Sequence, residues 1–152
     1  MANTQSMCTS FLQELMQGLQ NFTTSTGNSF KAALYLASAT INASTTQFTT
    51  TNEVSGTGYT AGGIAVTNGT SPLSTNASAT AGVAYWTPSA SLTYSSVTLT
   101  TAFDAVLIYN NTNSNRAVSV HTFGSQTITA GTFTLTMPSN TTTAALLRLS
   151  TT

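Results

Sequence analysis

The chain has 152 residues and a net charge of zero, and only 4% of its residues are charged, against about 25% in an ordinary soluble domain. Its three Lys and Arg residues are dispersed, which excludes nucleic-acid binding by clustered cations that neutralise phosphates. No stretch approaches the roughly 18 apolar residues of a membrane-spanning helix, so we expect neither a nucleic acid nor a membrane as a partner.

The N-terminal segment is predicted to form a helix over about residues 5–22. Its apolar residues recur every three or four positions, as on one face of a helix: Met7, Phe11, Leu15, Leu19 and Phe22. Gly18 lowers the helix propensity by about 1 kcal/mol relative to Ala, so packing must hold this helix. Cys8 lies in the same stripe and is expected to be a small buried hydrophobe. The opening MANTQSMCTS has no basic segment followed by a long apolar run, so we expect no secretory signal.

The rest of the chain, from about residue 29 to about residue 150, has an apolar period of two, which predicts β-strands. The predicted strands are 29–37, 64–67, 83–87, 91–100, 102–110, 117–123, 126–130, 132–138 and 146–150. Residues 102–110 (AFDAVLIYN) are apolar on both faces, which indicates a central strand. Short separators rich in Gly, Asn, Ser and Pro favour tight turns between the strands.

These elements predict a mainly β fold in one domain over residues 1–152. We expect an antiparallel β-sandwich or jelly-roll-like body over about 29–150, with one N-terminal α-helix. In the first predicted strand, one face would carry Phe30, Ala32, Leu34 and Leu36.

The segment NEVSGTGYTAGG (52–63) contains four glycines and could be taken for a phosphate-binding loop. A dinucleotide-binding loop needs a helix to follow it, and a P-loop needs Gly-Lys-Ser/Thr. Here IAVTNGTSP (64–72) follows, with a turn and a proline, and the nearest lysine is Lys31. We therefore expect no nucleotide or other cofactor, and glycines that allow positive φ angles and close approach between strands.

The ionisable residues do not form a recognisable catalytic or metal-binding set. One histidine and one cysteine cannot build a usual zinc site, and a triad of His121, Asp104 and a serine would lack the GxSxG motif. Glycoside hydrolysis needs two flanking carboxylates, and Glu14 is on the predicted helix. We predict no catalytic, cofactor-binding or metal-binding residues and no enzymatic activity. Asp104 and Arg148, each within an apolar strand, are expected to form a partly buried ion pair.

A series of segments, in order along nearly the whole chain, carries a resemblance to a known family. The segments are FLQELMQGLQNF (11–22), FKAALYLASAT (30–40), NEVSGTGYTAGG (52–63), AYWTPS (84–89), AFDAVLIYN (102–110), Phe123-Gly124, AGTFTLTMP (130–138) and LLRL (146–149). In these segments, of which 52–63 is the most specific, the chain resembles a family of small virion proteins of tailed bacteriophages. The resemblance implies a structural component of the virion without enzymatic residues.

The position in the virion is a separate question. We expect a capsid decoration or cement protein on the capsid exterior, bound to the major capsid protein lattice as a homotrimer. The alternative is a tail-associated component, such as a fibre, adaptor or baseplate module. A short chain without a fibrous repeat or a long coiled coil favours the first. A third hypothesis, a cell-surface adhesin or sugar-binding sandwich, would require an export route.

Overall fold

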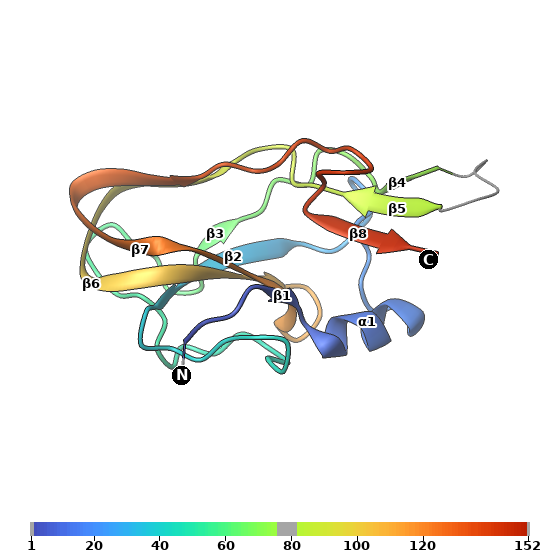
Figure 1. The fold of residues 1–152 in the computed structure, drawn as a ribbon. Coiled ribbons are helices and arrows are strands. Elements are labelled where there is room, and N and C mark those ends of the chain that lie inside the picture. The colour runs from blue at the N-terminus through green and yellow to red at the C-terminus, as the bar shows by residue number, and fades with distance from the viewer. Residues whose placement is uncertain (1, 76–81, 152) are drawn as a thin grey trace.

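A computed structural model gives the fold and describes residues 2–75 and 82–151 (Figure 1). The elements are β1 (Ser6–Met7), α1 (Thr9–Met16), β2 (Phe30–Leu36), β3 (Ile64–Ala65), β4 (Leu73–Ser74), β5 (Val83–Trp86), β6 (Leu92–Asn110), β7 (Arg116–Leu135) and β8 (Leu147–Ser150). They form a five-stranded sheet in the order β1-β7-β6-β2-β3 and a three-stranded sheet in the order β4-β5-β8. All strand pairs are antiparallel.

The predicted fold class, mainly antiparallel β with one short helix among the described residues, is confirmed. Figure 1 shows the small sheet in a second layer over the start of β2, which is a sandwich-like arrangement. The jelly-roll part of the expectation stays a prediction.

The longest feature of the fold is the hairpin of β6 and β7, where the sequence predicted five shorter strands. Gly124-Ser125 and Gly131, which separate three of the predicted strands and were expected to be turns, lie inside β7. The pairing of β6 with β7 shifts register at five places, and Ser96 and Ala130 adopt positive φ angles there. Such bulges bend a strand pair and let it pass from one layer to another, and Figure 1 shows the hairpin curving in this way.

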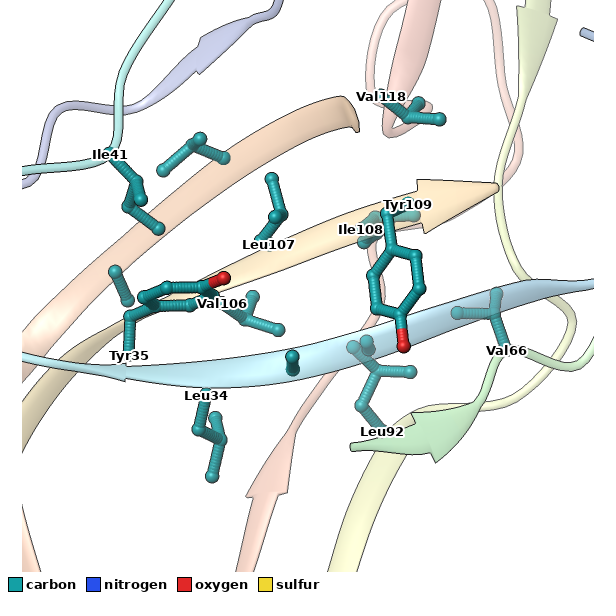
Figure 2. Packing of buried hydrophobic residues seen from close by; sticks show 14 of the residues in the cluster. Leu34, Tyr35, Ile41, Val66, Leu92, Val106, Leu107, Ile108, Tyr109 and Val118 are labelled. Atoms are coloured by element: carbon teal, nitrogen blue, oxygen red, sulfur yellow. The ribbon is translucent and has the colours of Figure 1, made fainter. Parts of the chain in front are cut away.

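The core is centred on β2 and the second half of β6. Residues 105–110 of β6 are all buried, and β6 is the middle strand of its sheet, so the predicted central strand is confirmed. The expectation of one apolar face for β2 was incomplete, because Ala33 and Tyr35 are buried as well. Leu34 and Tyr35 project from opposite faces of β2 (Figure 2).

The predicted helix over residues 5–22 is wrong in its bounds, since α1 covers only Thr9–Met16. Gly18 ends it with a φ of 68°. The Gly18 amide donates to the carbonyl of Leu15 (3.2 Å) and the Leu19 amide to that of Glu14 (3.0 Å), which is the Schellman pattern of a helix end. Gly18 therefore acts as a stop signal, and the apolar stripe is divided between β1, α1 and the loop after α1.

Trp86 of β5 joins the small sheet to the rest of the core. Its ring centroid lies 4.7 Å from that of Phe22 and 6.2 Å from that of Phe30 on β2. The indole Nε1–H lies 3.0 Å from both the side-chain oxygen of Asn68 and the carbonyl of Thr70. The side chain is buried, so one residue supplies apolar contact with the larger sheet and hydrogen bonds to the loop between β3 and β4.

Candidate functional site

The glycine-rich segment 52–63 is a loop packed closely on the sheet. Gly58, Gly62 and Gly63 have φ angles of 79°, 86° and 72°, which residues with a Cβ rarely adopt. A Cβ at Gly63 would overlap the carbonyl of Ala32 on β2, and one at Gly58 would overlap the carbonyl of Ser96 on β6. The expected roles of these glycines, positive φ and close backbone approach, are confirmed.

The carboxylate of Glu53 closes this loop. Its Oε1 accepts hydrogen bonds from the Tyr59 hydroxyl (2.9 Å) and the Gly62 amide (2.6 Å). The Tyr59 hydroxyl also accepts from the Leu34 amide of β2 (3.0 Å), and the Tyr109 hydroxyl donates to the Gly62 carbonyl (2.7 Å). These bonds fasten the loop to the two central strands.

The ionisation of this cluster follows from its burial. Desolvation raises the pKa of Glu53, while the hydrogen bonds from Tyr59 and Gly62 and the positive charge of Lys31 act in the opposite direction. Desolvation raises the pKa of Tyr109 to about 12. The Glu53 Oε1 atom and the Tyr59 hydroxyl both form hydrogen bonds within the loop, and the Tyr59 hydroxyl also bonds to β2. We therefore assign this cluster a structural role.

The strongest candidate for an interaction site is a cleft between α1 and the small sheet, which we call the apolar cleft. It has a volume of about 110 Å³ and is lined by Phe11, Leu15, Phe22, Pro72, Ala84, Tyr85, Trp86, Leu147 and Leu149. The register pairs Ala84 with Leu149 and Trp86 with Leu147, which places these four side chains on one face of the small sheet.

One end of the apolar cleft is filled and the other is open. Trp86 and Leu147 are buried at the inner end, whereas Ala84 is exposed and Leu149 is 41% exposed. Met16 of α1 is 84% exposed but does not line the cleft. Exposed apolar groups in a hollow favour a contact with another apolar surface over chemistry on a bound small polar molecule.

An ion pair between α1 and β7 holds the helix in position. Arg116 Nη1 donates to Glu14 Oε1 at 2.9 Å, and the Gln20 side chain donates to Glu14 Oε2 at 2.6 Å. Glu14 is buried and the Arg116 side chain is 37% exposed. Sequence reasoning missed this pair, because nothing local connects residues that lie 102 positions apart.

The predicted pair of Asp104 and Arg148 is wrong. Asp104 Oδ1 accepts instead from the Asn3 side chain at 2.6 Å, and Arg148 is exposed with its Nη1 3.3 Å from the Thr142 carbonyl. The two residues lie on β6 and β8, which belong to different sheets. Since Asp104 is only half-buried, an asparagine partner suffices in place of a cation.

We expect a double-mutant cycle on Glu14 and Arg116 to show coupling. Arg116→Met should lower the free energy of unfolding by roughly 1–3 kcal/mol, because it leaves the buried Glu14 carboxylate without a cation while solvent near the half-exposed arginine reduces the loss. The double variant with Glu14→Gln should lose less than the sum of the two single changes. Urea unfolding measures all three.

Arg148→Met is the matched control for that cycle, since Arg148 is an exposed arginine. It should change the free energy of unfolding by no more than about 0.5 kcal/mol. Equal losses in the Arg116 and Arg148 variants, or strict additivity in the cycle, would contradict a stabilising role for the pair.

The single cysteine is buried and the single histidine is half-buried. Cys8 lies in the core with no exposed surface, which confirms its expected role as a small buried hydrophobe, and this burial raises its pKa to about 12. Burial lowers the pKa of His121 to about 4, and its Nε2 lies 2.9 Å from the Ser119 hydroxyl. Within residues 2–75 and 82–151, no hydrogen bond joins Asp104 to His121, and no three His, Cys, Asp or Glu residues form a possible metal site. The described helix is too short to cross a membrane.

Comparisons with protein-family models, with curated proteins and with solved structures found no significant match to this chain.

Proposed function

We propose that this chain is a structural protein of a bacteriophage virion, a capsid decoration or cement protein that binds the major capsid protein lattice and stabilises the head. The observation that carries the proposal is the open apolar cleft on a chain with only 4% charged residues. Exposed apolar area surrounded by neutral polar groups is typical of a surface that another protein covers. The resemblance of eight segments to tailed-phage virion proteins supports the choice of partner.

The proposed contact places an apolar segment of the capsid subunit in the cleft, against Leu149 and Ala84. Such a contact involves no charged group, so dissolved ions screen it little, and its strength should change weakly between low and high salt. Each contact is small, but a homotrimer on a lattice would engage several at once, which raises the overall affinity.

We expect phage particles that lack this protein to release their DNA at a lower temperature than complete particles do. The physical reason is that each bound copy adds contacts which must break before the lattice opens. A thermal release assay with a DNA-binding dye measures the difference, and quantitative gel analysis of purified particles should give hundreds of copies. A few copies at the tail, with particles of equal robustness that fail to adsorb, would replace the capsid role with the tail-associated one.

The cleft itself is tested by Leu149→Gln, with Leu73→Gln as the matched control. Both leucines are similarly exposed (41% and 44%), but only Leu149 lines the cleft. Burial of a leucine contributes about 1.5–3 kcal/mol, so Leu149→Gln should weaken binding to stripped particles roughly tenfold or more, and Leu73→Gln should leave it unchanged. Equal binding by the two variants would exclude the cleft as the capsid contact.

A further inference from the structure

The outer edge of β7 lacks a partner strand over most of its length. Along one edge β7 pairs with β6, from Arg116 to Leu135. Along the other edge, β1 pairs only with Ser119 and Val120. In the part of the chain that the structure describes, no backbone hydrogen bond reaches this second edge from residue 121 to residue 135. We call this stretch the free edge.

The free edge also lacks the residues that usually keep sheet edges apart. Its sequence, HTFGSQTITAGTFTL (121–135), contains no Lys, Arg, Asp, Glu or Pro, whereas exposed edges are commonly protected by charged residues and prolines. It is rich in Thr, Ile and Phe, which fit a paired strand. The bulges in the hairpin interrupt the edge, but residues 133–135 pair with Leu92–Tyr94 in regular register.

A row of half-buried apolar side chains follows the free edge. Phe123, Ile128, Phe133 and Leu135 all pack against the core while remaining partly accessible. The rings of Phe123 and Phe133 have their centroids 5.0 Å apart. A strand added to the free edge would cover these side chains and satisfy the open row of N–H and C=O groups at the same time.

We propose that the free edge of β7 pairs with an edge strand of a second copy of this chain. The unpaired N–H and C=O groups of the free edge are matched by those of another strand edge. The two edges must also carry charges that do not repel each other. Two copies of a neutral chain meet without repulsion, and an uncharged edge gives a charged partner no opposite charge to pair with. The inference rests on the self-association in the proposed function and assigns that association to a surface.

The test is the oligomeric state of the purified protein in the absence of phage particles. Thr127 and Thr129 are exposed on the free edge, so Thr127→Lys with Thr129→Lys places two charges on it. The wild-type protein should be an oligomer by light scattering after gel filtration, and this double variant should be a monomer at the same concentration.

The matched control is Thr50→Lys with Thr51→Lys, which adds the same charge at exposed positions of a loop outside every strand edge and should remain an oligomer. A circular dichroism spectrum shared by all three proteins ensures that the variants are folded. Amide hydrogen exchange should also be slower in residues 122–135 at high protein concentration than at low concentration, in the wild type and the control variant but not in the edge variant.

The outcomes distinguish the assignment of the interface to the free edge from the proposal that the protein self-associates. If the wild type is an oligomer and the edge variant remains one, the edge assignment is wrong while self-association stands. If the wild type is a monomer at all concentrations, both are wrong. Neither result bears on binding to the capsid, which the copy number and thermal release assays measure separately.

Discussion

Trp86→Ala should lower the free energy of unfolding by about 3–5 kcal/mol, as expected for removal of a large buried aromatic side chain. The indole ring packs on Phe22 and lies near Phe30 of β2, so it contributes to the contact between the small sheet and the larger one. Its removal also leaves the side-chain oxygen of Asn68 and the carbonyl of Thr70 without the donor that they share. Urea unfolding monitored by far-UV circular dichroism measures the loss.

Trp86→Phe separates the two contributions. It keeps an aromatic ring in the site but removes the N–H donor, so we expect a loss of roughly 1–3 kcal/mol. A loss of less than about 1 kcal/mol in the alanine variant would mean that the small sheet does not depend on this ring. Equal losses in the two variants would assign the whole effect to the hydrogen bonds.

Gly63→Ala should be nearly as damaging. Gly63 has a φ of 72°, and an added Cβ would overlap the carbonyl of Ala32, which is backbone and cannot rotate away. Strain at a positive φ costs about 1–3 kcal/mol, and overpacking costs about 1–3 kcal/mol more. We therefore expect a loss of roughly 2–6 kcal/mol and a weakened pairing of β3 with β2, measured by urea unfolding and amide hydrogen exchange.

Gly124→Ala is the control for this change of one methyl group. A Cβ at Gly124 meets nothing within 4 Å, so the free energy of unfolding should change by no more than about 0.5 kcal/mol. If the Gly63 variant were as stable as the Gly124 variant, the close approach of the loop to β2 would not exist in solution.

Local sequence pattern was sufficient where the nearest neighbours decide the structure. The run FKAALYL (30–36) forms β2 as predicted, and the glycines of segment 52–63 have the predicted backbone role. The sequence pattern led to wrong predictions where one residue type is compatible with two local structures. Gly18 was read as a weak position inside a helix, but its left-handed φ ends the helix. Gly124 and Gly131 were read as turns, but they lie within β7.

The candidate interaction surfaces depend on contacts that no local pattern contains. The apolar cleft combines α1 with β5 and β8, and its existence requires the helix to stop at Met16. Asp104 and Arg148 were paired because both interrupt apolar runs, yet sequence gives no information about which sheet each strand joins. The free edge of β7 exists because β1 has only two residues and covers little of that edge. The residues of β1 were expected to be part of the predicted helix.

The ion pair between Glu14 and Arg116 has a consequence for the order of folding. An eight-residue helix is not stable by itself, and β1 has only two residues, so both need β7 before they can form. Glu14 and Arg116 are separated by 102 positions, and contacts at such separations form slowly. The hairpin of β6 and β7, in contrast, closes through the short turn at residues 111–115. We therefore expect the hairpin of β6 and β7 to form first, and β1 and α1 to dock on β7 afterwards, although they precede it in the sequence.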